Sequence, residues 1–313
     1  MYILIKFKKK RKSTLMKIYD CFLFHDETML LEIRFNILNK FVEKFVISEA
    51  KYLHNGKKKN LNFKINDYPD FKNKIEYIVV DDLPPDILIE KDNDDKTVKN
   101  NKKLINGQRR ETYQRNRLLD VIKTVDDEDF IIISDSDEIP NIQKIYGQNI
   151  DNDIIFFKQK MFYYKFNLYY ENYNWYGSKG TKKKNFLSPQ WIRSIKNKNY
   201  PFWRVDTHFS KKKYRNIRFI EDGGWHFTCI KTPEGVHEKL LSFSHYPDYE
   251  SSNISLEDLK QTIFDKKALY DHTKDRTSQS KWLSDVKLKK IDDRFLPDYL
   301  ISKRSNYKDW FEV

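Results

Sequence analysis

The sequence predicts an α/β fold of three layers, built on a central and mostly parallel sheet. Two observations carry this prediction. Strand-like and helix-like segments alternate through the first half of the chain, a pattern that favours parallel strands joined by right-handed crossovers. The most apolar strand, 130–133, runs directly into the carboxylates of Asp135, Asp137 and Glu138. Ligands of open α/β sheets collect at the carboxyl ends of strands, so this strand end is the first candidate for a functional site.

Three strands and two helices are expected before this strand. The strands are segments 17–24, 44–48 and 75–80. After the first strand, Asp26 is placed to cap a helix, because apolar residues between 31 and 42 recur at helical spacing. A second helix is expected over 108–125. The stretch 90–103 is dense in Lys, Asn and Asp, and we expect it to form a mobile loop.

Aromatic residues dominate the start of the second half. Segment 154–158 reads as one more strand, and residues 161–176 are rich in Phe, Tyr and Trp. We expect most of these rings in a β-rich core, with a few left to stack on sugar or base faces. The segment from Ser255 to Asp258 resembles a capping box that opens a helix. The sequence therefore predicts a single domain over 16–313, behind a disordered basic leader at 1–15.

Composition limits the partners and the compartment. The 313 residues carry a formal net charge of +13, which favours an anionic partner. Cys21 and Cys229 are the only cysteines, so we expect no disulfide framework and a cytoplasmic or otherwise reducing compartment. No stretch approaches the roughly 20 apolar residues that a membrane helix needs, and the start of the chain has no secretory signal pattern.

The aspartates after the central strand predict a metal site. If the strand geometry continued, its period of two would aim Asp135 and Asp137 at one point. Two converging carboxylates repel each other unless a cation lies between them. Mg²⁺ and Mn²⁺ take oxygen ligands of this kind and leave positions open for phosphate oxygens. No glycine-rich phosphate loop is present, so metal and basic side chains would have to hold a phosphate.

A second candidate cluster surrounds Gly223 and Gly224. In a chain with only 8 glycines, an adjacent pair indicates positive φ or a close approach of the backbone. His226 follows this pair, and His245 is its rival further along the chain. Either imidazole could complete a carboxylate-based site, because nitrogen ligands are acceptable to Mn²⁺.

Several motifs follow one another between residues 17 and 246. They are Asp20-Cys-Phe-Leu-Phe24 with the helix that contains Arg34, Phe45-Val-Ile-Ser-Glu49 with His54 to Lys57, Ser134 to Pro140, and Gly224-Trp-His226 with Thr232 to Gly235 and Lys239. Together they resemble glycosyltransferase family 17, the family of the β-1,4-mannosyl-glycoprotein 4-β-N-acetylglucosaminyltransferase. The resemblance implies a GT-A-like fold, with a nucleotide-sugar half at 16–140 and an acceptor half with C-terminal helices at 141–313. It also implies inverting transfer of GlcNAc from UDP-GlcNAc to a glycan hydroxyl.

This chemistry assigns roles to the candidate residues. Asp137 is expected to bind the metal directly, Asp135 to help through ribose or a metal-bound water, and His226 to be the leading third ligand. The residues expected to bind the nucleotide sugar are Glu49, Lys57, Arg115 and Asp135. Inversion also needs a carboxylate that takes the proton of the acceptor hydroxyl. The candidates are Asp222 and Glu221, then Glu234, with Glu138 as a further possibility.

Two other classes of function fit parts of the sequence. A basic module could bind RNA or single-stranded DNA through its lysine clusters and aromatic rings, and would not need the aspartates. A metal-dependent phosphodiesterase would use the same carboxylates without a sugar acceptor. The transferase interpretation expects a UDP-sugar and a glycan as partners, Mn²⁺ or Mg²⁺ as cofactor, and no nucleic acid.

Overall fold

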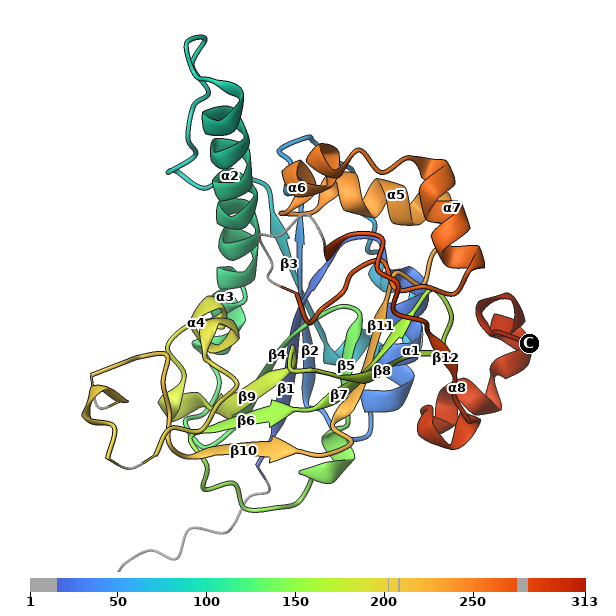
Figure 1. The fold of residues 1–313 in the computed structure, drawn as a ribbon. Coiled ribbons are helices and arrows are strands. Elements are labelled where there is room, and N and C mark those ends of the chain that lie inside the picture. The colour runs from blue at the N-terminus through green and yellow to red at the C-terminus, as the bar shows by residue number, and fades with distance from the viewer. Residues whose placement is uncertain (1–15, 202, 208, 275–280) are drawn as a thin grey trace, which may run out of the picture.

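A computed structural model describes residues 16–201, 203–207, 209–274 and 281–313 (Figure 1). The predicted leader at 1–15 lies outside these residues. The chain forms two sheets with helices around them, and the larger sheet has 7 strands in the order β10-β6-β9-β4-β1-β2-β3. These strands are β1 Ile18–Phe24, β2 Lys44–Ala50, β3 Ile75–Val80, β4 Phe130–Asp135, β6 Ile154–Phe157, β9 Lys179–Lys182 and β10 Ile217–Ile220.

The larger sheet is mostly parallel, as predicted. Strands β3, β2, β1 and β4 pair in parallel, and so do β6 and β10. Strand β9 lies antiparallel between β4 and β6. From β1 the chain moves outward to β2 and β3 and then returns to place β4 on the other side of β1. The strand order therefore reverses between β1 and β4, and crevices at such points bind ligands in α/β proteins.

The smaller sheet belongs to the aromatic half of the chain. Its order is β12-β8-β7-β11-β5, with β5 Glu138–Pro140, β7 Gln159–Tyr163, β8 Leu168–Trp175, β11 Gly224–Thr228 and β12 Lys289–Lys290. Strand β5 starts only three residues after β4 ends, and it pairs antiparallel with β11, opposing Glu138 to His226. This register brings the predicted acidic motif and the predicted histidine together.

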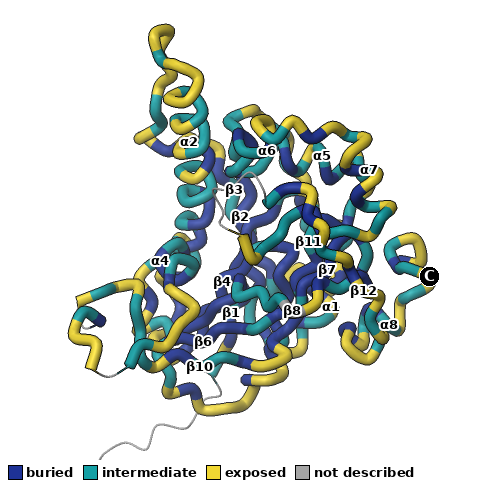
Figure 2. Tube along the Cα trace, viewed as in Figure 1, coloured by how far each residue is buried: buried dark blue, intermediate teal, exposed yellow. Residues whose placement is uncertain are grey.

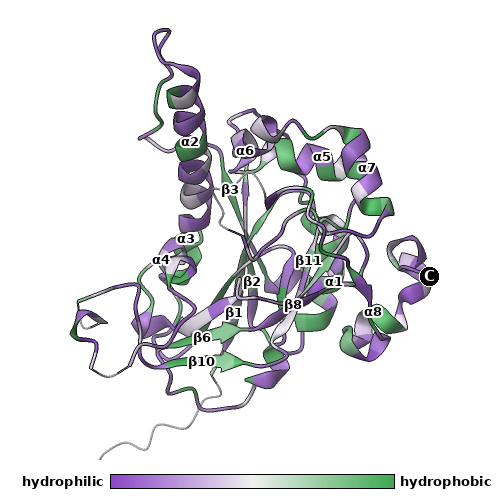
Figure 3. Cartoon of the chain, viewed as in Figure 1, coloured by the Kyte–Doolittle hydropathy of each residue, from purple (hydrophilic) through white to green (hydrophobic). Residues whose placement is uncertain are grey.

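Helices cover both faces of the larger sheet, which confirms the three-layer α/β architecture (Figure 1). The helices are α1 Thr28–Leu38, α2 Lys96–Asn116, α3 Leu119–Ile122, α4 Pro189–Ser194, α5 Pro233–Ser242, α6 Tyr246–Ser252, α7 Leu256–Phe264 and α8 Asp298–Ser302. Strand β1 alternates between the layers: Phe22 packs in the core beneath α1, whereas Cys21 packs with Leu118 and Ile122 on the opposite face. The buried strands stand out in Figure 2 and their apolar character in Figure 3.

Two local predictions in the first half are wrong. Helix α2 begins at Lys96, inside the stretch expected to be a loop, where the Asp95 side chain accepts a hydrogen bond from the Val98 N–H. The first part of this helix projects from the body (Figure 1). A helix that packs against nothing needs no apolar face, so the sequence of this part shows no apolar periodicity that would predict a helix. Asp26 does not cap α1, whose N-cap is Glu27. Asp26 instead forms an ion pair with Lys231 at 2.8 Å.

Other local predictions are confirmed. The capping box at Ser255 and Asp258 opens α7. Gly224 has a φ of +128°, and a Cβ there would overlap the Ile139 carbonyl, so the glycine allows β5 and β11 to approach each other. None of the described helices combines the length and the apolar character that a membrane crossing requires.

Candidate active site

A cavity of about 260 Å³ opens where the order of the larger sheet reverses. Its wall includes Phe24 at the end of β1, Ala50 at the end of β2 and Asp135 at the end of β4. Residues of α2, β11 and α5 close the other sides. The cavity therefore lies at the strand ends where the sequence predicted a ligand site.

The turn between β4 and β5 is shaped by a buried arginine. Arg34 is fully buried and forms a two-point ion pair with Asp20, with N–O distances of 2.6 and 2.7 Å. Its remaining Nη1 donates to the carbonyl oxygens of Asp135 at 3.2 Å and Glu138 at 2.6 Å. In a β-strand, successive carbonyl groups point to opposite sides, so carbonyl groups that converge on one cation are not in strand geometry. The strand geometry therefore ends at Asp135, and Asp135 and Asp137 face different partners.

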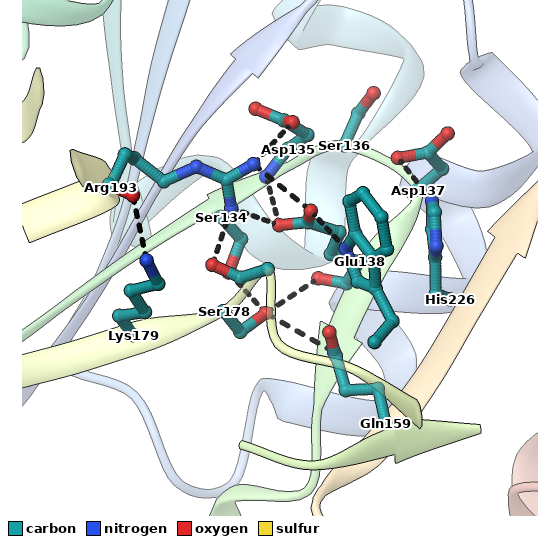
Figure 4. Close-up of polar contacts among 12 residues, drawn as sticks. Ser134, Asp135, Ser136, Asp137, Glu138, Gln159, Ser178, Lys179, Arg193 and His226 are labelled. Carbon is teal, nitrogen blue, oxygen red and sulfur yellow. Dashed lines mark hydrogen bonds and ion pairs between the residues drawn. The ribbon is translucent and has the colours of Figure 1, made fainter. Parts of the chain in front are cut away.

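Asp135 lies between two guanidinium groups, of which Figure 4 shows that of Arg193. Its Oδ1 is 3.1 Å from Arg115, and its Oδ2 is 2.7 Å from Arg193. Arg193 comes from α4 and also contacts Glu138 at 2.6 Å. Burial alone would lower the pKa of Arg193, but the carboxylates of Asp135 and Glu138 outweigh it and raise that pKa. Asp135 is thus held in place by fixed positive charge.

Asp137 faces a lysine and a histidine instead. Its Oδ2 is 3.0 Å from Lys239 Nζ, and its Oδ1 is 3.5 Å from His226 Nε2. Burial raises the pKa of Asp137, but the charge of Lys239 and the neighbouring His226 ring outweigh it and hold the pKa well below its ordinary value. Lys239 has a further carboxylate partner in Glu27, at 3.7 Å. Asp137 is therefore ionised over the whole physiological pH range.

Glu138 is fully buried and already has several hydrogen-bond donors. Trp175 Nε1 donates to Oε1 at 2.6 Å, while Arg193 and the Asp135 N–H donate to Oε2 at 2.6 and 2.8 Å. Burial raises the pKa of Glu138, but the guanidinium of Arg193 outweighs it and lowers that pKa. A carboxylate that accepts this many hydrogen bonds is suited to holding the site together, so its predicted role as a base is disfavoured.

The predicted nucleotide-binding residues divide between the cavity and the scaffold. Arg115 and Asp135 line the cavity. Glu49 is fully buried and accepts hydrogen bonds from Tyr77 and from the backbone N–H groups of residues 62 and 63. It also pairs with Lys59, which lines the cavity, whereas Lys57 is exposed outside it. Glu49 therefore positions Lys59 in the cavity. The sequence had predicted Lys57 for this place.

The predicted bases lie elsewhere. Glu221 and Asp222 form the exposed turn before β11 and pair with Lys158 and Lys160. Glu234 is exposed in the first turn of α5, and none of these three carboxylates lines the cavity. His245 also lies outside the cavity. Of the two histidines, the structure brings His226 to Asp137.

The residues present fit a divalent ion in part. Among the described residues, no three His, Cys, Asp or Glu side chains gather closely enough to bind a metal by themselves. Asp137 and His226 supply two facing atoms, and Mg²⁺ and Mn²⁺ are often held by few protein ligands together with phosphate and water oxygens. The His226 ring stacks on Trp175, with ring centroids 4.7 Å apart. The buried Nδ1 of His226 has no hydrogen-bond partner in the described part of the chain, so the stacking contact is what orients the ring.

Three residues of this site had no predicted role. Arg34 and Lys239 stand inside the motifs of the sequence, but only the fold reveals what they contact. Arg193 follows no motif, and its contacts with Asp135 and Glu138 span 58 and 55 residues. No local signal could have identified it.

A cavity lined by acidic and basic side chains at the strand ends of a mostly parallel α/β sheet is suited to an enzyme that binds a phosphorylated ligand. The chain belongs to glycosyltransferase family 17, whose family model matches residues 4–311. No curated protein matches it. Among solved structures, it is similar to the galactosyltransferase LgtC in complex with donor and acceptor sugar analogues. That match has 11% identity and a TM-score of 0.26, and covers 54% of this chain and 59% of that chain.

Proposed function

We propose that this protein transfers GlcNAc from a UDP-sugar to a glycan hydroxyl, with inversion at the anomeric carbon and with Mn²⁺ or Mg²⁺ as cofactor. The observation that carries the proposal is the pair formed by Asp137 Oδ1 and His226 Nε2, 3.5 Å apart, beside the cavity at the strand ends. Membership of the family supplies the reaction class.

Asp137 and His226 would hold the ion, and Asp135 would contact the ribose or a metal-bound water. When bound, such an ion neutralises the negative charge that develops on the departing diphosphate. Lys239 donates a hydrogen bond to the second oxygen of Asp137, Oδ2, which would leave Oδ1 available to hold the ion. The stacked ring of Trp175 keeps His226 aimed at that atom.

Basic side chains would bind the diphosphate. Lys59, Arg115 and Lys239 line the cavity from three different elements or loops. Burial lowers the pKa of Lys239, but Asp137 and Glu27 outweigh it and raise that pKa well above its ordinary value, so the ammonium stays charged. A cation fixed in advance stabilises developing phosphate charge without reorganising during the reaction. Lys59 takes the part that the sequence assigned to Lys57.

The proton of the acceptor hydroxyl needs a carboxylate within hydrogen-bond reach. Asp222 stays our first candidate because it stands four residues before His226 in the same motif, but its carboxylate pairs with Lys160 outside the cavity. Glu221 and Glu234 follow. An acceptor that uses Asp222 would have to approach from the turn between β10 and β11. Glu111, which lines the cavity, is the competing candidate.

The test is a nucleotide-release assay with a panel of UDP-sugars and soluble glycans, in Mn²⁺ and in EDTA. The proposal expects UDP release from UDP-GlcNAc that requires the metal and rises when an acceptor glycan is added. Asp137→Asn should abolish it, whereas Asp92→Asn, which changes an exposed carboxylate before α2, should not. Metal-dependent release of UMP and a sugar phosphate in place of UDP, unchanged by any acceptor, would instead select the phosphodiesterase, and full activity in EDTA would overturn the metal assignment.

A further inference from the structure

The described residues of the segment that joins α4 and β10 project from the body beside the larger sheet (Figure 1), and many of them are exposed (Figure 2). Three apolar side chains stand on it: Trp203 is 66% exposed, Val205 67% and Phe209 85%. Three exposed apolar side chains within seven consecutive positions of the sequence favour a surface that contacts a membrane or another molecule. This cluster needs a physical explanation, because water is a poor solvent for it.

Cations flank the apolar side chains on both sides in the sequence. Between residues 196 and 215 the basic residues are Lys196, Lys198, Arg204, Lys211, Lys212, Lys213 and Arg215, against the acidic Asp206. Asp206 already pairs with Arg204 and Lys213. Lys196, Lys198, Lys211 and Lys212 are exposed. The surface thus combines apolar side chains with a strong excess of positive charge.

The segment is tied to the active site at its base. Trp191 of α4 donates a hydrogen bond from Nε1 to the carbonyl of Lys211 at 2.6 Å, and the Lys196 N–H donates to the carbonyl of Lys212 at 3.1 Å. The same helix carries Arg193, which contacts Asp135. A surface bound by this segment would therefore lie on the α4 side of the enzyme, where a glycan carried by that surface could approach.

We propose that this segment docks the enzyme onto a bilayer that contains anionic phospholipids. Peripheral binding of this kind needs two contributions, apolar insertion into the interface and attraction of cations to acidic headgroups. Phe209 and Val205 supply the first, and the flanking lysines supply the second. A nucleic acid would use the charge and could stack on the rings, but the aliphatic side chain of Val205 offers nothing to stack. The proposal does not depend on the identity of the donor sugar.

Vesicle sedimentation tests the proposal with the full-length chain. We expect binding to vesicles of equal parts phosphatidylcholine and phosphatidylglycerol, little binding to phosphatidylcholine alone, and release at high salt. Phe209→Ser should weaken binding roughly tenfold, because it removes a ring that the interface buries. Replacing Lys196, Lys211 and Lys212 by Ser should weaken it roughly hundredfold, at about fivefold per lysine.

Matched controls separate this surface from general charge and apolarity. Phe264 of α7 is 80% exposed, so Phe264→Ser repeats the chemical change at a remote site. A triple Ser variant of the exposed Lys64, Lys72 and Lys290 repeats the change in charge. Both controls should bind like the wild type, and Phe209→Ser should keep full UDP release with a soluble acceptor. Equal losses in variants and controls would overturn the proposal. Failure to bind anionic vesicles at low salt would also overturn the proposal. The exposed apolar surface would then be better explained by a protein partner.

Discussion

Replacing Arg34 should destabilise the protein more than any single surface change. The side chain is fully buried, pairs at two points with the equally buried Asp20, and donates to the carbonyls of the turn after β4. Arg34→Met keeps much of the volume but leaves the Asp20 carboxylate buried without its cation. Removing one partner of a buried ion pair costs about 3 to 5 kcal/mol, which is a large part of the roughly 5 to 15 kcal/mol that stabilises a typical domain.

Urea titration followed by circular dichroism measures this loss. The double variant Asp20→Asn with Arg34→Met should be more stable than the sum of the two single losses predicts, because it leaves no buried charge unpaired. Arg294→Met is the control. The Arg294 side chain is 74% exposed, and its ion pair with Asp292 is weak because the two atoms lie as far as 3.9 Å apart. That control should change the free energy of unfolding by no more than about 0.5 kcal/mol.

The reasoning also predicts a functional consequence. Arg34 fixes the backbone that carries Asp135 and Glu138, so even the folded fraction of Arg34→Met should bind UDP more weakly than the wild type. The account of this turn would be refuted if Arg34→Met were as stable as Arg294→Met. It would also be refuted if the variant were less stable but bound UDP with unchanged affinity.

Three further predictions concern the site. Asp222→Asn should lower kcat by about 10²-fold or more with little change in UDP affinity; an unchanged kcat would pass the role of base to Glu111, which Glu111→Gln would then test. Lys239→Met should weaken UDP binding, measured by calorimetry, more than Lys57→Met does, because Lys239 lines the cavity and Lys57 does not. Equal losses of UDP affinity in the two variants would argue against a role of Lys239 in binding the diphosphate. The stability gained from Asp137 should be constant from neutral pH down to about pH 5 and decline only below its ordinary pKa of 3.8, because its folded pKa is lower still. The difference in unfolding free energy between the wild type and Asp137→Asn, followed against pH, measures this, and a decline already at pH 6 would contradict it.

Periodicity and composition predicted the scaffold well. The strands at 17–24, 75–80 and 130–133 and the crossover pattern all follow from short-range patterns that the fold preserves. Helix α2 was placed too late because its first two turns carry Val98 as their single apolar residue and project into solvent, so no apolar face marked their start. Such a helix is recognised by its Asp95 cap and not by its burial.

The acidic motif could be found from the sequence, but its geometry could not. The strand period aimed Asp135 and Asp137 at one point, whereas Arg34 turns the backbone after Asp135 and separates their partners. Arg193 and Lys239 reach these carboxylates from 58 and 102 residues away. Contacts of this range depend on how the two sheets pack, which no local pattern records.

The central claim is that Asp137 and His226 hold a divalent ion that binds the diphosphate. Calorimetric titration of UDP into the protein, with Mn²⁺ and with EDTA, tests it most directly. The account predicts UDP binding that requires Mn²⁺ and that falls in both Asp137→Asn and His226→Ala by more than the roughly 10- to 100-fold typical of an outer-shell change, while Asp92→Asn binds normally. UDP that binds equally well in EDTA, or to both variants as to the wild type, would contradict it.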